Sequence, residues 1–115
     1  MKLPDVEKAE IHEAKIVRYL LSTSHRAGKS KASFFMEFGF HPDRWQELAG
    51  ALRQHAVDNE VAVEEHTTFG PRYVIEGLLK APDGTWLNIR SAWFINEEGG
   101  IPRFITAHPL RRRRS

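Results

Sequence analysis

The sequence of 115 residues contains no cysteine, which excludes both a disulfide framework and a thiolate metal site. It also has no apolar stretch near the roughly 18 residues that a membrane span needs. The first residues, Met1 to Asp5, lack the apolar run of a signal peptide. We therefore expect a cytoplasmic protein without a membrane segment, in keeping with a reducing compartment.

A strong net charge is missing as well. The chain has 17 Lys and Arg against 15 Asp and Glu, and four of the positive charges form the run at residues 111–114. Residues 1–110 therefore carry 13 basic against 15 acidic side chains, a net charge of −2. We expect a single α+β domain over residues 1–110, followed by a basic tail at 111–115. The tail is either simply solvated or adds a salt-sensitive attraction to phosphates.

Apolar residues recur at three- and four-residue spacing through the N-terminal half of the sequence, which predicts helices. The predicted helices cover about 12–23, 32–38 and 42–59. The second stops at Gly39, and the third begins at His41-Pro42-Asp43, because Pro and Asp are favoured in a first helical turn. Asn59 is expected to end the third helix in a left-handed conformation.

After residue 60 the spacing of apolar residues changes to two, which predicts strands over about 61–68, 73–80, 86–95 and 103–108. Turn signals separate them at 69–71, at 81–84 and, more loosely, at 97–100. Strands joined by short turns pair in antiparallel fashion. Helices followed by such strands indicate an α+β fold, with about three helices packed on a four-stranded antiparallel meander.

A polar, basic segment lies between the first two predicted helices, from His25 to Lys31. Its Gly28-Lys29-Ser30 run lacks the first glycine and the preceding strand of a phosphate-binding loop. We interpret it instead as a basic lead into a helix start, where backbone amides and Lys29 or Lys31 hold a phosphate. The alternative is a solvated loop with a serine at the helix start.

The six histidines show no metal-site spacing and no compact cluster with carboxylates, so we expect neither a metal nor another cofactor. His25 and His108 are the candidates for an acid and a base, because imidazole transfers protons near neutral pH. The alternative for each is a surface or capping histidine. His12 and His55 are expected on the exposed, polar sides of their helices.

Strand alternation brings further polar residues together. Arg90 lies in the middle of an inner strand, where a buried arginine needs an anionic partner. That partner is either Glu76, in a structural ion pair, or a substrate phosphate. Thr106 and His108 share one face of the last strand and are expected near Arg90. The substrate-binding candidates around this region are Lys31, Arg72, Tyr73 and Arg103.

Short motifs extend over nearly the whole chain. They are Lys15…Tyr19-Leu20-Leu21, His25…Gly28-Lys29-Ser30-Lys31-Ala32…Phe35, Gly39-Phe40…Trp45…Leu48, Phe69-Gly70…Tyr73…Glu76-Gly77, Pro82-Asp83-Gly84, Arg90…Trp93 and Pro102-Arg103…Thr106-Ala107. The set resembles an uncharacterised family of small bacterial domains. Related modules occur at the C-termini of polymorphic toxins.

The order of the predicted elements is also similar to the barnase–EndoU–colicin–RelE ribonuclease architecture. This resemblance implies a toxin-type domain that cleaves RNA without a metal ion, through attack of the 2′-hydroxyl on the adjacent phosphate. The roles of individual residues rest on position and chemistry. His25 and His108 would transfer protons, Lys29 and Arg90 would stabilise the charged phosphorane, and Thr106 would orient the substrate.

A second hypothesis remains open, in which the chain is no enzyme but a binding module. Its partner would be a small acidic antitoxin-like or immunity protein, or RNA that it binds without cleavage. This hypothesis predicts an exposed apolar patch around Trp86 or Trp93. The ribonuclease hypothesis predicts instead that the segment around Lys29 and the side chain of Arg90 lie on the same side of the molecule. The sequence leaves the oligomeric state open.

Overall fold

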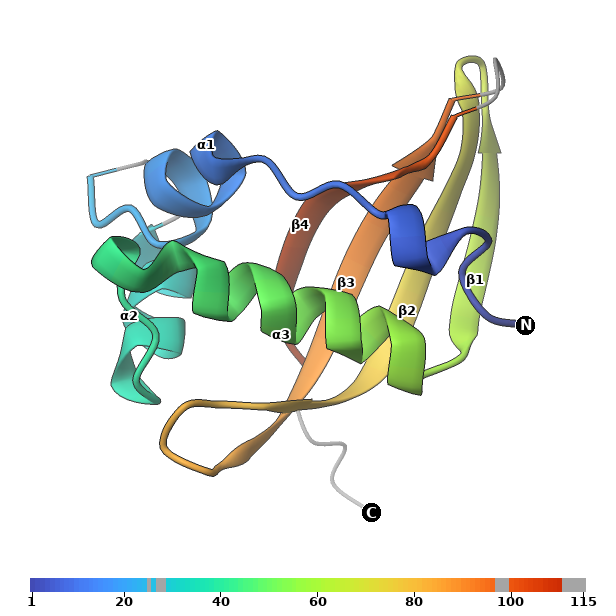
Figure 1. Ribbon diagram of the computed structural model, residues 1–115. Helices are drawn as coiled ribbons and strands as arrows, with labels where there is room; N and C mark the ends of the chain where they lie inside the picture. The colour runs from blue at the N-terminus through green and yellow to red at the C-terminus, as the bar shows by residue number, and fades with distance from the viewer. Residues whose placement is uncertain (25, 27–28, 97–99, 111–115) are drawn as a thin grey trace.

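The computed structural model describes residues 1–24, 26, 29–96 and 100–110, apart from the side chain of Lys29. Figure 1 shows helices gathered against one side of a four-stranded sheet, so the predicted α+β class is confirmed. The elements in chain order are η1 (Val6–Lys8), α1 (Glu13–Lys15), η2 (Ile16–Leu20), α2 (Lys29–Glu37), η3 (Pro42–Arg44), α3 (Trp45–Asp58), β1 (Val61–Thr67), β2 (Gly70–Lys80), β3 (Trp86–Ile95) and β4 (Pro102–Pro109).

The first predicted helix divides into two short pieces. A single α-helical turn, α1, runs directly into η2, a π-helical turn closed by the 2.7 Å bond from the Leu21 amide to the Ile16 carbonyl. Wider turns of this kind occur often at functional sites. Ile16 and Leu20 are fully buried, which ties η2 to the core. Helix α2 is followed by Gly39 at φ +106°, a conformation that favours glycine.

Side chains cap the short turn that leads into helix α3 and the end of the helix itself. At its entry, Nδ1 of His41 accepts a hydrogen bond from the Asp43 amide at 3.1 Å, which fixes the short turn η3. At its end, the prediction of a left-handed Asn59 is wrong, because this residue is extended, with φ −119°. The side-chain amide of Asn59 donates instead to the backbone carbonyls of His55 and Leu78. A Cβ on Gly77 would lie 2.0 Å from this side chain, so a larger residue at position 77 would displace Asn59 from its hydrogen bonds.

The predicted meander is confirmed. The strand order is β1-β2-β3-β4, and every neighbouring pair is antiparallel. Strand β2 begins at Gly70 rather than at residue 73, because the preceding turn contains only Thr68 and Phe69. The predicted loose connection before β4 falls largely on residues 97–99, outside the described residues. A register shift between Ala92 and Trp93 interrupts the pairing of β3 with β4.

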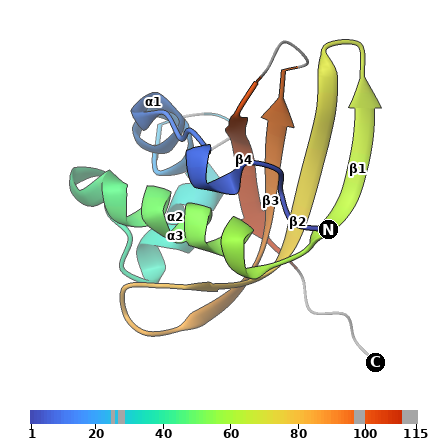
Figure 2. The same ribbon diagram turned by 45° about the vertical axis from the view of Figure 1, so that its right-hand side comes forward.

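The two faces of the sheet have different surroundings. Helix α3 crosses one face, while α1 and α2 lie beside the edge strand β4, as Figures 1 and 2 both show. The face toward α3 carries the apolar core, which includes Ile75, Leu79, Ile89 and Trp93. The opposite face carries mostly polar side chains, together with the exposed Leu78 and Trp86, and we call it the polar face. Among the described residues, no helix is long and apolar enough to cross a membrane.

His55 lies inside the core, so its predicted place on an exposed helix side is wrong. It is 1% exposed, and its Nε2 contacts the carbonyls of Gly77 and Ile89 at 3.1 and 3.0 Å. Nδ1 lies 3.1 Å from the Ser91 hydroxyl, to which the Trp93 indole donates at 2.9 Å. Carbonyl oxygens can only accept, so the two contacts of Nε2 require a proton on that nitrogen. Burial is the main cause that lowers the pKa of His55, so the ring is neutral.

Candidate functional site

A cluster of polar side chains joins the helices to strand β4. Tyr19 of η2 and Thr106 of β4 lie 87 residues apart in the sequence, yet their hydroxyls are 2.8 Å apart. The ammonium group of Lys31, on the first turn of α2, donates to the Tyr19 hydroxyl and, at 3.2 Å, to Thr106. All three side chains are partly buried. The packing of η2 and α2 beside the sheet edge therefore brings these three side chains together.

Strand register extends the cluster across the polar face. His108 follows Thr106 by two residues and thus shares its face. Arg90 of β3 is the direct partner of His108 on one side and of Glu76 on the other. The Arg90 guanidinium lies 3.6 Å from the Glu76 carboxylate, and both side chains are about one-third exposed. A solute in water can therefore reach this line of charged groups.

Burial and the nearby cations together keep the imidazole of His108 neutral. Burial is the main cause that lowers the pKa of His108 below 6.5, and the nearby cations Lys31 and Arg90 lower it further. Glu76 acts in the opposite direction with a smaller effect. Within the described part of the chain, no hydrogen bond holds the His108 imidazole. A neutral, half-buried imidazole of this kind can accept a proton near neutral pH.

Tyr19 is a stronger acid than an ordinary tyrosine. Burial alone would raise the pKa of its hydroxyl, but the hydrogen bonds from Lys31 and Thr106, together with the Lys31 charge, bring the pKa below 10.0. The ammonium of Lys15 adds a smaller effect in the same direction, from 5.7 Å above the ring. A phenol whose anion is stabilised in this way can donate a proton more readily.

Four of the predicted site residues come together here. Lys31, Arg90, Thr106 and His108 form a continuous group, in which His108 lies near both cations. Lys29 begins α2, but its side chain lies outside the described part of the structure, and so does His25. The segment around Lys29 and the Arg90 side chain thus lie on the same side of the molecule. Their catalytic roles stay predictions.

Three other candidates lie away from the group. Arg72 pairs with Glu65 at 3.3 Å, four residues along β2 from Glu76. Tyr73 is 7% exposed and packs in the core, on the face opposite to His108. Arg103 lies at the other end of β4, about 16 Å from His108 at about 3.3 Å per strand residue.

Tyr19 is the residue of the site that sequence reasoning did not select. Its spacing from Ile16 and Leu20 predicts only a place on the apolar side of a helix, where aromatic residues usually contribute packing alone. The motif Lys15…Tyr19-Leu20 marked the segment without a chemical role. Only the tertiary contact with Lys31 and Thr106 reveals the hydroxyl as part of a charged cluster. Among the described residues, no three His, Asp or Glu side chains group as they would around a metal ion.

Comparisons with known proteins identify both a family and a fold. The family model described as "Domain of unknown function (DUF6883)" matches residues 2–111. No curated protein matches the sequence. A chain in a structure described as "Contact-dependent growth inhibition toxin - immunity protein complex from Klebsiella pneumoniae 342" matches with a TM-score of 0.71. The match covers 94% of this chain and 98% of that chain, at 18% identity, so the likeness shows a shared fold.

Proposed function

The chain belongs to the DUF6883 family, and we propose that it is a toxin-type module that cleaves RNA without a metal ion. The observation that carries the proposal is the cluster at the edge of β4. It places a neutral imidazole (His108), an acidic phenol (Tyr19) and two cations (Lys31 and Arg90) within one accessible group. Cleavage of a phosphodiester needs a base, an acid and positive charge around the phosphate.

Each group has a distinct role in the proposed reaction. The neutral His108 accepts the proton of the ribose 2′-hydroxyl, and the 2′-oxygen forms a bond to the adjacent phosphorus. The bond from phosphorus to the 5′-oxygen breaks, and Tyr19 donates a proton to the departing oxygen. The products are a 2′,3′-cyclic phosphate and a 5′-hydroxyl, with no water consumed. His25 is the alternative proton donor predicted from the sequence.

The cations stabilise the charge that develops on phosphorus. Lys31 contacts both Tyr19 and Thr106, so a phosphate bound beside Thr106 meets its ammonium group directly. Arg90 is the cross-strand neighbour of His108 and supplies the second positive charge beside the phosphate. Fixed charges in a partly buried site act more strongly than they do in water.

The ion pair between Arg90 and Glu76, one of the two partners expected from the sequence, is present. It is compatible with a phosphate-binding role. Exposed pairs of this kind contribute only about 0–1 kcal/mol, so an incoming phosphate can compete with the carboxylate for the guanidinium. Glu76 then keeps Arg90 oriented while the site is empty.

A second function has support of its own. The structural relative comes from a complex that contains a toxin and an immunity protein, so a shared fold fits either side of such a pair. In this alternative, the chain binds a protein partner and performs no chemistry. Trp86 is 56% exposed and fits the apolar patch that this alternative expects, whereas Trp93 is fully buried, so its predicted exposure is wrong. The polar cluster favours the first function.

The test is cleavage of RNA by the purified protein in EDTA. The parent protein is incubated with total bacterial RNA, beside a His108→Ala variant. We expect fragments that end in 2′,3′-cyclic phosphates from the parent only, because the variant lacks the proton acceptor. The matched control is His66→Ala, since His66 is an exposed histidine on β1 that lies far from the cluster in the strand order.

The control variant should cleave as the parent does. Absence of cleavage by the parent over a range of salt and pH would contradict the proposal and leave the protein-binding alternative. Equal cleavage by His108→Ala and the parent would contradict the assigned site.

A further inference from the structure

The polar face continues beyond the cluster toward the turn that joins β2 and β3. On β3, the exposed residues Trp86 and Asn88 precede Arg90 and alternate with the buried Leu87 and Ile89. The Cα atoms of Trp86 and Arg90 are about 13 Å apart, since four strand residues advance about 3.3 Å each. An exposed indole therefore lies within reach of a polymer whose phosphate is bound at Arg90.

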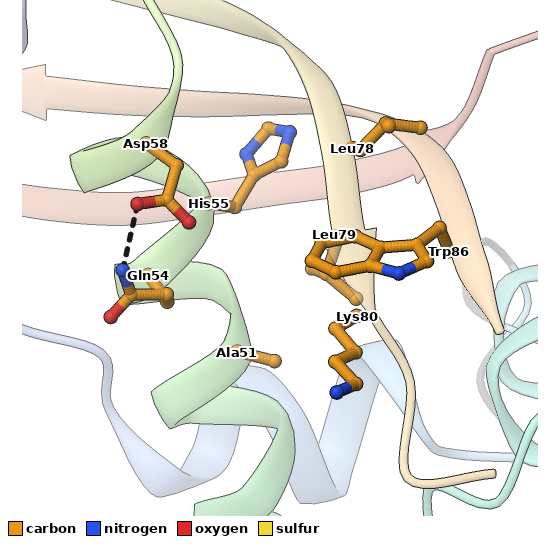
Figure 3. Close-up of a pocket in the computed structure, with 8 residues that line it drawn as sticks. All are labelled: Ala51, Gln54, His55, Asp58, Leu78, Leu79, Lys80 and Trp86. Atoms are coloured by element: carbon orange, nitrogen blue, oxygen red, sulfur yellow. Dashed lines mark hydrogen bonds between the residues drawn. The ribbon is translucent and has the colours of Figure 1, made fainter. Parts of the chain in front are cut away.

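Trp86 is paired with a cation. Lys80 of β2 is its direct partner across the strands, and the ammonium group lies 5.8 Å from the centre of the indole. Figure 3 shows the two side chains next to each other on one side of a pocket of about 190 Å³. Gln54 and Asp58 of helix α3 line the other side. The pocket opens at the free edge of β2, because β1 pairs with β2 only as far as Ile75.

We infer that Lys80, Trp86, Asn88 and Arg90 form an extended binding strip for single-stranded RNA, with one base stacked on Trp86. Stacking of bases on aromatic side chains tolerates any sequence, and nearby cations hold the phosphates. The Asn88 amide can donate to and accept from base edges. This inference rests on the proposed function and extends it from one phosphate to a substrate of several nucleotides.

Charge and geometry favour RNA over a protein partner on this strip. Residues 1–110 carry a net charge of −2, yet Lys80 and Arg90 lie along the strip, and Lys31 lies beyond His108. Glu76 offsets one of these charges through its pair with Arg90, so Lys80 and Lys31 supply the net positive charge. Bases in a duplex are stacked on their neighbours, so an indole can bind only an unpaired base.

The experiment measures binding of a fluorescently labelled 2′-O-methyl RNA hexamer by anisotropy. This probe lacks the attacking hydroxyl and stays intact. Trp86→Ala should weaken binding by about 5- to 150-fold, the range for loss of one base–aromatic stack. Trp86→Phe should retain most of the affinity, because it keeps an aromatic face. Phe69→Ala is the matched control, since Phe69 is 78% exposed and lies in the turn between β1 and β2.

Two results would overturn the inference. One is equal hexamer affinity in the parent and in a folded Trp86→Ala variant, including no affinity in either. The other is an equal loss in Phe69→Ala, which would indicate nonspecific adhesion. The result is separable from that of the proposed function. Hexamer binding that depends on Trp86 supports the strip even if ordinary RNA stays uncleaved, whereas cleavage that is indifferent to Trp86 supports the cluster alone.

Discussion

Two histidines lie on opposite sides of the same sheet, His55 in helix α3 and His108 in strand β4, and their surroundings differ. His55 and His108 both have a lowered pKa, and burial is the main cause for each. The ring nitrogens of His55 are fully engaged with Ser91 and two backbone carbonyls, and the residue is 1% exposed. His108 is half-buried and lies beside Lys31 and Arg90.

The difference lies in what surrounds each imidazole. Neutral hydrogen-bond partners surround His55, so its loss should affect folding. Burial lowers the pKa of His108 most, and the neighbouring cations Lys31 and Arg90 lower it further, against the opposing carboxylate of Glu76. A lowered pKa alone therefore does not identify a catalytic histidine. Exposure and nearby charge separate the two cases.

The largest expected effect is the loss of RNA cleavage when His108 is replaced. His108→Ala should lower the rate of RNA cleavage about 100- to 10,000-fold, the contribution of a positioned proton-transfer group. Its melting temperature should stay close to that of the parent, because the side chain is only half-buried. Initial rates on a defined oligonucleotide and a thermal melt measure both. A large loss of stability with a small loss of rate would remove the distinction.

Removal of the Lys31 charge should have the next largest effect. Lys31→Met keeps the aliphatic stem but removes the ammonium, and we expect cleavage to slow about 100- to 1,000-fold, as for loss of one fixed charge at the reacting group. The Tyr19 pKa should rise toward 10.0 in this variant. An ultraviolet titration of the phenol detects that change. Lys8→Met, in the short turn η1, is the matched control and should leave both rate and pKa unchanged.

His55→Ala should act on stability. The change removes a buried ring and leaves the Ser91 hydroxyl and two carbonyls without their partner, so we expect a loss of about 2–4 kcal/mol in the free energy of unfolding. Urea denaturation measures it. The specific cleavage rate of the folded fraction should remain near that of the parent. Unchanged stability would show that the hydrogen bonds of His55 contribute little.

The pH dependence of stability should show the contribution of the buried His55. The folded pKa of His55 lies below its unfolded value of 6.5, so the unfolded chain takes up a proton first as the pH falls. The stability that His55 contributes is therefore complete above pH 6.5 and declines below it. Urea denaturation at pH 7.5 and pH 5.5 should show this decline in the parent and a smaller one in His55→Gln. An equal decline in both proteins would assign it to other groups.

The smallest expected effect concerns the exposed ion pair. Glu76→Gln should change the free energy of unfolding by less than about 1 kcal/mol, because water screens the pair with Arg90. In a filter-binding assay, affinity for RNA should stay equal or rise, since the variant frees the guanidinium. A clear loss of RNA affinity would mean that Glu76 itself contacts the substrate.

The sequence predicts the sheet better than the site. Residues 86–95 alternate so regularly that the bounds of β3 match the prediction. The bulge at Ala92/Trp93 has no such signal, although it determines which residues of β4 share the polar face. His55 follows Leu48 and Leu52 by seven and three residues, so helical spacing places it on the buried side, but its polarity suggested exposure. The contact between Tyr19 and Thr106 depends on how η2 packs, which one sequence does not specify.

The most direct measurement follows both histidines in one NMR titration. Imidazole resonances are recorded against pH, first without ligand and then with each nucleoside 3′-monophosphate. We predict that His108 titrates below pH 6.5 in the free protein and that its pKa rises when a nucleotide binds, because the phosphate stabilises the imidazolium. His55 should show no response to the nucleotide. A His108 pKa that no nucleotide changes would contradict a phosphate site at the edge of β4.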